Sequence, residues 1–388
     1  MAEDIDQKLL QRFEIIQKIR KVSGGVIWKA IDRKTNSVFE FIEILLVAIK
    51  KIDYSANPLH LLKSMRETVI LQEISKHPNI MKVLSVINKG NDQYTIYDFV
   101  EMDLISLIKV KILQPKHIQI ILSNIVNTLY FIHSGGLVHL SLTPSKILVD
   151  SECQIKMIGF GFSQLLQVKD PKYTCLHYLP PEILLQGKVN TSADIWSLGC
   201  IFGEMLCHHP LFVGNSTFNQ IEKIVELIGK PSDTNLSELA PYVLQGIQPD
   251  RKKTFTSISN DSTAIDLLKR MLVFLPHERI TLIDILKHPY LNEFANKCEL
   301  KKAIAPFQIE ENSFKEFQNI LRERGKKVEQ PSINNSFNQQ LDTSRKKSFR
   351  ESSPISALKQ KTTTKIKVNS PIQSPKIQKL YQIDEKQR

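Results

Sequence analysis

The sequence has no long hydrophobic run and few cysteines. Its most apolar stretch, FEFIEILLVAIKK, is interrupted by Glu40, Glu43 and Lys50, so it falls short of the ~20 apolar residues of a membrane-spanning helix. The N-terminus, MAEDIDQKLLQRFE, mixes charges of both signs without an apolar core, unlike a secretory signal. The 5 cysteines are an odd number without framework spacing, which favours reduced thiols and a soluble, cytosolic protein.

Positive charge is concentrated near the C-terminus. The formal net charge is +12, and residues 321–388, with 16 Lys+Arg and 6 Asp+Glu, account for +10 of it. Residues 326–388 are rich in Lys, Gln, Ser, Thr and Pro, a composition typical of disorder. This basic tail is suited to acidic surfaces, and the alternative is a solvated tail without a dedicated ligand. Ser353, Ser370 and Ser374 precede prolines and are candidate phosphorylation sites.

Two regions of different periodicity precede the tail. β-branched and aromatic residues predict short strands over 13–19, 25–32, 47–53, 81–87 and 94–100. One helix is expected among them, over 57–76. After residue 104 helical patterns dominate, with helices expected over 118–134, 192–206, 217–229, 263–272 and 282–291. We therefore expect an α+β fold, with a small lobe built on a sheet and a larger helical lobe.

Several short motifs follow one another along the chain. They are VAIK (47–50), a helical Glu67, HLSLTPSK (139–146), GFG (159–161), PPE (180–182), DIWSLG (194–199) and HERI around Arg279. Each is weak alone, whereas in this order and spacing they resemble a eukaryotic protein kinase. The segments HPLFVGNSTFNQIEKIVELIGKPS and IAPFQIEENSFKEFQNIL further resemble the mitogen-activated protein kinase group, in particular its atypical, long-tailed extracellular-signal-regulated branch.

The resemblance implies a kinase domain over 13–295, with lobes at about 13–100 and 101–295. Residues 1–12 would then be an N-terminal extension, and 296–325 a post-domain extension. Between TNSV and VAIKKID lie eight residues, 39–46. They are either a protrusion from the sheet or a short intron translated in frame. No nucleic-acid-binding fold is evident.

The resemblance also implies a nucleotide cleft. Lys50 matches the lysine that holds the phosphates and Glu67 the carboxylate that orients it, although both could equally form a structural ion pair. Arg20 and Val22 replace the first two glycines of the phosphate loop, and only Gly25 remains, so tight phosphate wrapping is not expected. The purine and ribose positions are Ile27, Ala48, Asp98, Val100, Asp103 and Leu148, which ordinary core packing would also explain.

The positions that carry the reaction in kinases are changed. Ser141 stands for the catalytic base and has no carboxylate, where general-base catalysis is typically worth ~10²–10⁴-fold. Thr143 stands for the lysine that steadies the transferred phosphate. The two magnesium-ligand positions hold Lys146 and Gly159, which offer no oxygen ligand in their side chains. We therefore expect ATP binding to be weak at most and magnesium binding to be absent.

The positions that carry the fold are kept, whereas those that carry regulation are not. His139, Phe160 and Leu71 match an apolar column between the lobes. Asp194 matches the carboxylate that holds the catalytic loop, and Glu182 with Arg279 matches a buried ion pair. Leu140 replaces the arginine that would pair with an activation phosphate. Asp170, Pro171 and Lys172 stand where a Thr-x-Tyr pair is expected.

These features predict a pseudokinase that works as a binding or scaffold module in signalling, with protein partners. One alternative is a serine/threonine kinase with weak or unconventional ATP-dependent activity. Another is a nucleotide-gated switch in which Lys146 supplies part of the missing cation charge, unless that lysine is simply solvated. The family branch implies a cytoplasmic location, with the nucleus, cilium or basal body as further expectations.

Overall fold

The computed structural model describes residues 5–22, 25–33, 45–53, 58–89, 92–166, 175–231, 237, 240–247, 253–295 and 300–307. The chain divides into two units, 1–317 and 318–388, and every described residue belongs to the first. The basic tail and its three Ser-Pro sites therefore lie outside the described residues. So do residues 170–172 of the activation segment and most of the insertion at 39–46.

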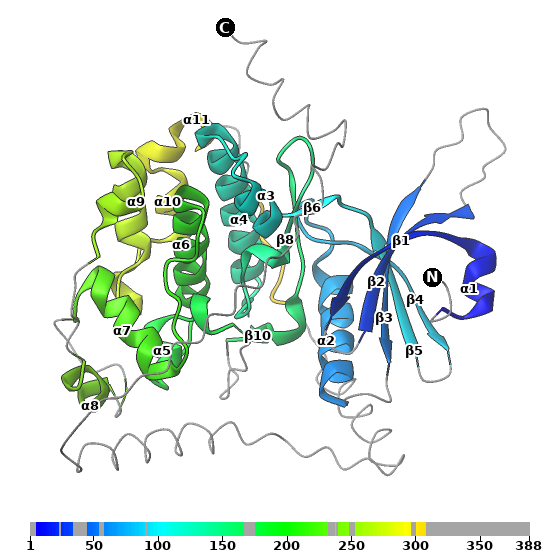
Figure 1. Ribbon diagram of the computed structural model, residues 1–388, viewed down its shortest axis with the longest axis horizontal. Coiled ribbons are helices and arrows are strands. Elements are labelled where there is room, and N and C mark those ends of the chain that lie inside the picture. Colours follow the sequence, from blue (N-terminus) through cyan, green and yellow to red (C-terminus); the bar gives the residue numbers. More distant parts are fainter. Residues whose placement is uncertain are drawn as a thin grey trace, which may run out of the picture. The chain divides into compact units, whose positions relative to one another are not determined.

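The small lobe is a five-stranded antiparallel sheet with the order β1-β2-β3-β5-β4. Its strands are β1 (Phe13–Val22), β2 (Gly25–Asp32), β3 (Leu46–Asp53), β4 (Val83–Lys89) and β5 (Asp92–Asp98). Helix α2 (Pro58–Ile74) packs on the side of the sheet nearer the large lobe, and α1 (Gln7–Arg12) on the opposite side (Figure 1). The sheet and its main helix confirm the predicted small lobe.

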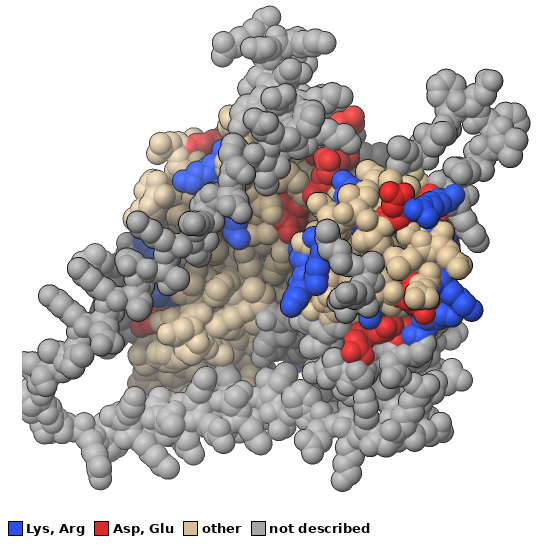
Figure 2. All heavy atoms as spheres, turned by 45° about the vertical axis from the view of Figure 1, so that its right-hand side comes forward, with Lys and Arg blue, Asp and Glu red and all other residues tan. Residues whose placement is uncertain are grey.

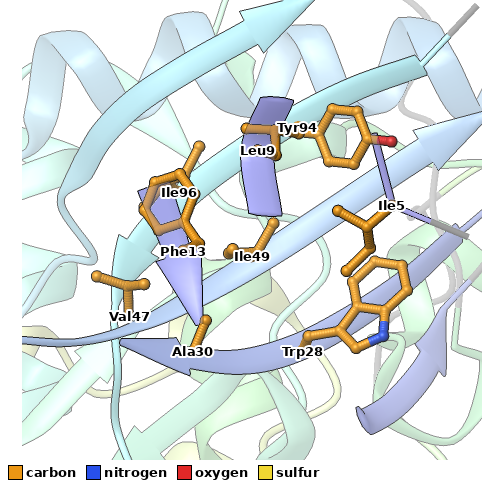
Figure 3. Close-up of a cluster of buried hydrophobic side chains, with 9 residues drawn as sticks. All are labelled: Ile5, Leu9, Phe13, Trp28, Ala30, Val47, Ile49, Tyr94 and Ile96. Carbon is orange, nitrogen blue, oxygen red and sulfur yellow. The ribbon is translucent and has the colours of Figure 1, made fainter. Parts of the chain in front are cut away.

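The outer face of the sheet carries a hydrophobic core that includes the N-terminal extension. Figure 3 shows its nine buried side chains, which are Ile5, Leu9, Phe13, Trp28, Ala30, Val47, Ile49, Tyr94 and Ile96. Ile5 and Leu9 are only 6% and 5% exposed. The backbone N–H of Asp6 also donates to the Tyr94 hydroxyl at 3.3 Å. Residues 5–12 are therefore an integral part of the small lobe, because they close one face of its sheet.

The end of the insertion contributes to the sheet. β3 begins at Leu46, which pairs with Ile31 on β2. The carbonyl of Leu45 accepts a hydrogen bond from the backbone N–H of Asp32 at 3.1 Å. The last two residues of 39–46 therefore continue the β2–β3 ladder, and the remainder lies outside the described residues.

The large lobe is mainly helical (Figure 1). Its helices are α3 (Leu104–Val110), α4 (Pro115–Ser134), α5 (Pro181–Leu184), α6 (Ser192–Cys207), α7 (Thr217–Ile228), α8 (Ala240–Gln245), α9 (Ser262–Met271), α10 (Leu282–Leu286) and α11 (Asn292–Ala295). Helix α6 is buried from Ser192 to Met205, as its apolar composition predicts. In the part of the chain that the structure describes, no helix is both long and apolar enough to cross a membrane.

Short strands of the large lobe lie beside the cleft. They are β6 (Met102–Asp103), β7 (Leu137–Val138), β8 (Ile147–Val149), β9 (Ile155–Met157) and β10 (Gln164–Leu165). β6, β8 and β9 form a three-stranded antiparallel sheet, and β7 pairs with β10. The loop HLSLTPSK runs between β7 and β8.

The helix predicted over 282–291 is wrong in its second half. α10 ends at Leu286, and Pro289 begins a separate 3₁₀ turn, η7 (Pro289–Leu291). Proline lacks the N–H that would continue an α-helix, and the His288 side chain instead accepts from the Tyr290 N–H at 3.3 Å.

The surface of the described residues has no dominant charged patch on the face shown in Figure 2. Acidic and basic side chains are interspersed there.

Candidate active site

An ion pair at the centre of the cleft joins the sheet to α2. The Nζ of Lys50, on β3, lies 2.6 Å from Oε2 of Glu67, on α2. The second carboxylate oxygen of Glu67 accepts from the backbone N–H of Gly159 at 2.8 Å. Burial alone would lower the pKa of Lys50, but the Glu67 carboxylate outweighs it and holds that pKa well above its usual value. Glu67 therefore ties the sheet, α2 and the GFG turn together.

The pKa of Glu67 is low for the converse reason. Burial alone favours the neutral acid, but the ammonium groups of Lys50 and Lys146 outweigh it and hold the pKa of Glu67 below its usual value. Both members of the pair are therefore charged at neutral pH. A buried, charged and hydrogen-bonded pair is compatible with a phosphate anchor and with a purely structural link.

Helix α2 also contacts the GFG segment directly. Arg66 donates from Nε and Nη2 to the carbonyl of Ser163, at 3.1 and 2.8 Å. The Lys63 ammonium lies 4.2 Å from the centre of the Phe162 ring. A β-carbon on Gly161 would come within 2.8 Å of the Lys63 carbonyl oxygen. The absence of a side chain at Gly161 thus permits this close approach, which fixes α2 toward the cleft.

The predicted apolar column is assembled in the core. Leu71, His139 and Phe160 are all fully buried. The rings of His139 and Phe160 have centroids 4.7 Å apart. Burial lowers the pKa of His139, which favours the neutral imidazole. The column connects α2 with the catalytic loop and the GFG turn.

Asp194 holds the backbone of the catalytic loop. Its carboxylate accepts from the N–H of His139 at 2.8 Å and from the N–H of Leu140 at 2.9 Å. It also lies 2.8 Å from Nε2 of His133. Leu140 has a φ of +59°, a left-handed conformation that is costly for a side chain of this size. The buried carboxylate therefore stabilises a loop conformation that the leucine alone would not favour.

Glu182 and Arg279 form a buried bidentate pair. The two guanidinium nitrogens donate to the carboxylate at 2.8 and 2.7 Å, and the side chains are 1% and 0% exposed. Arg279 donates further to the carbonyls of Val273, Phe274 and Ser192. Its remaining donors are therefore satisfied, which a buried guanidinium requires.

The three apolar purine positions are partly buried. Ile27, Ala48 and Leu148 are intermediate in burial, whereas their strand neighbours Trp28, Val47, Ile49, Ile147 and Val149 are in the core. This intermediate burial is compatible with a purine site and with ordinary packing at the edge of the core. Asp98 and Val100, at the end of β5 and just beyond it, are half-buried as well.

An ion pair that the sequence did not predict joins β1 to the start of α3. Nη1 of Arg20, on β1, lies 3.0 Å from Oδ2 of Asp103, the N-cap of α3. Asp103, predicted to meet a ribose hydroxyl, therefore contacts the residue that replaces the first loop glycine. Packing in the sheet explains why residue 25 is a glycine, because a β-carbon there would lie 1.8 Å from the Lys51 carbonyl oxygen.

The positions of the base and the phosphate-steadying lysine lie in a small hollow. Ser141 and Thr143 are 6% and 7% exposed. The N–H of Ser141 donates to Nδ1 of His139 at 3.3 Å, and the hydroxyl of Thr143 lies 3.0 Å from that of Ser145. The hollow is lined by Leu140, Ser141, Leu142, Thr143, Cys175, Tyr178, Leu179 and Ser197. None of these described residues carries a carboxylate that could serve as a base.

Lys146 packs onto Gly159. Lys146 ends the 3₁₀ turn η2 (Pro144–Lys146), and its stem passes over the α-carbon of Gly159. A β-carbon on Gly159 would lie 2.5 Å from Cδ and 3.0 Å from Cε of Lys146. The lysine stem therefore fills the space where an aspartate side chain would begin. Gly159 has a φ of +90°, which also favours glycine.

Magnesium does not fit this arrangement. Mg²⁺ needs oxygen ligands, and an ammonium and a glycine supply none from their side chains.

Two features of the site could not be predicted from the motifs. They are the contact of Lys146 with Gly159 and the Arg20–Asp103 pair. Both depend on residues that meet only in the folded chain.

Comparison with known proteins identifies the family. A protein kinase domain model matches residues 13–291. Extracellular signal-regulated kinase 2 of Dictyostelium discoideum is 36% identical over 318 residues, which cover 77% of this chain and 84% of that protein. Mitogen-activated protein kinase 15 of Caenorhabditis elegans is 35% identical over 322 residues, covering 77% and 67%. Extracellular signal-regulated kinase 7 of Drosophila melanogaster is 32% identical over 316 residues, covering 75% and 34%. The chain therefore belongs to the protein kinase family, within the mitogen-activated protein kinase group and its atypical branch of mitogen-activated protein kinase 15 and extracellular signal-regulated kinase 7.

Proposed function

We propose that this protein is a pseudokinase, a kinase-fold module that acts in signalling by binding other proteins and not by transferring phosphate. The observation that carries the proposal is the contact between Lys146 and Gly159. The lysine stem lies where the side chain of an aspartate at residue 159 would begin, with Cδ 2.5 Å from the position of a β-carbon. Phosphoryl transfer in kinases depends on that metal to neutralise developing charge.

The loss of the base supports the same proposal. The hollow that holds Ser141 has no carboxylate in its lining. A serine hydroxyl cannot accept the proton of a substrate hydroxyl at neutral pH, so the ~10²–10⁴-fold contribution of a general base is missing. Thr143 likewise supplies no positive charge to the transferred phosphate. These losses affect different parts of the reaction, so restoring one does not restore the others.

The intact contacts explain why the fold is retained. The pair Lys50–Glu67 joins α2 to the sheet, and the pair Glu182–Arg279 joins two segments of the large lobe, through side chains of the chain itself. A module that presents a fixed surface needs such contacts, whereas it does not need a base. The basic tail adds a segment suited to acidic partner surfaces. A cytoplasmic, ciliary or nuclear location stays a prediction.

A serine/threonine kinase with weak or unconventional activity is the second candidate. The observation that favours it is the 2.6 Å pair of Lys50 and Glu67, which is where the family holds the phosphates of ATP. Such a kinase would have to position phosphate and hydroxyl without a base, and without either magnesium ligand.

The test is label transfer from ATP to a generic basic protein substrate by the full chain, with magnesium and with manganese. The matched control is Lys50→Met, which removes the phosphate anchor. We expect the two proteins to give the same background. Transfer by the wild-type chain that Lys50→Met abolishes would overturn the pseudokinase proposal in favour of the weak kinase.

A further inference from the structure

We propose that Arg66 locks α2 against residues 159–163, so that phosphorylation of the activation segment does not move this helix. In protein kinases the placement of the corresponding helix is what activation-loop phosphorylation controls. The inference goes beyond the proposed function, because it concerns how the fold is regulated and not whether phosphate is transferred. It rests on the contacts that α2 makes with the large lobe and on the backbone nature of the groups that it contacts there.

Arg66 links the small lobe to the large lobe through two hydrogen bonds. Its Nε and Nη2 donate to one acceptor, the carbonyl of Ser163, at 3.1 and 2.8 Å. Because the guanidinium is planar and rigid, two donors on one acceptor fix the direction of the side chain as well as its distance. Ser163 is 0% exposed, and its hydroxyl donates to the His139 carbonyl at 3.2 Å. Arg66 therefore binds an acceptor that the large lobe holds in place.

Lys63 and Glu67 extend this link along the same face of α2. Residues three and four apart are neighbours on a helix surface, so Arg66 and Glu67 both lie beside Lys63. The Lys63 ammonium lies 4.2 Å from the centre of the Phe162 ring, and Glu67 accepts from the Gly159 N–H at 2.8 Å. The three side chains thus contact three different residues of the large lobe. Contacts spread over one turn resist rotation of the helix as well as its withdrawal.

The polar partners on the large lobe are backbone groups. The Ser163 carbonyl and the Gly159 N–H belong to the main chain, so neither depends on a side-chain rotamer or on a modification. The helix also lies so close that a β-carbon on Gly161 would come within 2.8 Å of the Lys63 carbonyl oxygen. This link needs no modification of the chain, whereas a link through phosphate exists only in modified molecules.

The sequence lacks both partners of a phosphate-dependent link. By its resemblance to kinases, Leu140 stands where an arginine would pair with the activation phosphate. Residues 170–172 stand where a Thr-x-Tyr pair would accept that phosphate. The contact of Arg66 with the Ser163 carbonyl therefore supplies directly what a phosphate would otherwise supply, which is a fixed position for α2.

The experiment is amide hydrogen exchange of the full chain, followed in α2 and in α6. Arg66→Gln should speed exchange in α2 by about tenfold, the effect of removing hydrogen bonds from a charged group. Exchange in α6 should stay unchanged, because the opening is local. The control is Arg270→Gln, which removes an exposed arginine paired with Asp266 and should leave α2 unchanged. Arg66→Lys keeps the charge and should give an intermediate rate, and it replaces Arg66→Gln if that variant does not fold.

A second arm tests the independence from phosphorylation. Tyr173→Glu combined with Thr174→Glu places negative charge in the activation segment, and we expect α2 to exchange as in the wild type. The inference is overturned if the Arg66 variants exchange in α2 at the wild-type rate, if α2 and α6 speed up equally, or if the charged double variant changes exchange in α2. Label transfer is a separate readout, so this inference and the pseudokinase proposal can each fail while the other stands.

Discussion

Lys146 and Gly159 are complementary in size: the lysine Cδ lies 2.5 Å from where a β-carbon of residue 159 would be. The two positions are the family's magnesium-ligand positions, so both ligands are replaced by one mutually adapted pair. A side chain at residue 159 would require the lysine stem to move. We therefore expect the two substitutions to act together and not independently.

This complementarity predicts non-additive effects on stability. Gly159→Ala should lower the free energy of unfolding by about 1–2 kcal/mol, because the residue has positive φ and meets the lysine stem. In a Lys146→Ala background the same substitution should cost less, by at least ~0.5 kcal/mol. Urea denaturation of the four proteins measures the coupling. Additive effects would show that the lysine stem does not constrain residue 159.

The buried pair of Glu182 and Arg279 should dominate the stability of the large lobe. Glu182→Ala should lower the free energy of unfolding by about 3–5 kcal/mol, because it leaves a buried guanidinium unpaired. The control is Arg270→Ala, which removes an exposed pair with Asp266, and it should cost no more than about 1 kcal/mol. Denaturation midpoints compare the two. Similar losses would mean that the buried pair is not a structural anchor.

Arg20 and Asp103 should restrict relative motion of the lobes without contributing much stability. Arg20 is 34% exposed, so Arg20→Ala should change the free energy of unfolding by only about 0–1 kcal/mol. It should nevertheless speed amide hydrogen exchange in β1, because the strand loses its link to α3. The control is Arg33→Ala, whose pair with Glu14 lies within the small lobe. Equal exchange in both variants would exclude a bridge between the lobes.

His77 should make stability depend on pH. It is 2% exposed, its Nδ1 accepts from the Asn79 N–H at 3.2 Å, and burial lowers its pKa to about 4. A histidine with a depressed folded pKa contributes stability that is present above the unfolded pKa of about 6.5 and is lost as pH falls toward 4. We expect a loss on the order of 1 kcal/mol between pH 7.5 and 5 from this residue.

The measurement is the free energy of unfolding against pH for the wild type and His77→Gln, which should have a shallower slope over this range. His277→Gln, at an exposed position, is the control and should leave the slope unchanged. If His77→Gln has the same slope as the wild type, then His77 does not take up a proton on unfolding.

Much of the fold could be predicted from periodicity. The strand over 25–32 and the helices over 192–206 and 217–229 agree with β2, α6 and α7 to within a residue, because each has one clear pattern and polar or glycine boundaries. The error at 282–291 arose where an apolar pattern continued across Pro289. The role of residues 5–12 was not predicted, because a short amphipathic segment gives no sign of which surface it will cover.

The candidate site was predictable only as a set of positions. Motif order located Lys50, Glu67 and Asp194, and each lies against the elements to which it was assigned. The partners of substituted residues were not predictable. The motif comparison identifies Arg20 only as the replacement of a loop glycine, whereas in the structure it pairs with Asp103. Nothing in the motifs indicates that Lys146 packs against Gly159. Packing between residues distant in the sequence decides such pairs, and no local pattern encodes it.

The most direct test of the account is single-turnover formation of ADP, with the full chain in excess over ATP and magnesium present. This measurement requires no knowledge of the substrate, because it detects transfer to any acceptor, including water and the chain itself. The account predicts ADP formation no faster than with Lys50→Met. A burst of ADP in the wild-type protein alone would contradict it, because a cleft with Lys146, Gly159 and Ser141 in place of the metal ligands and base would then be catalysing the reaction.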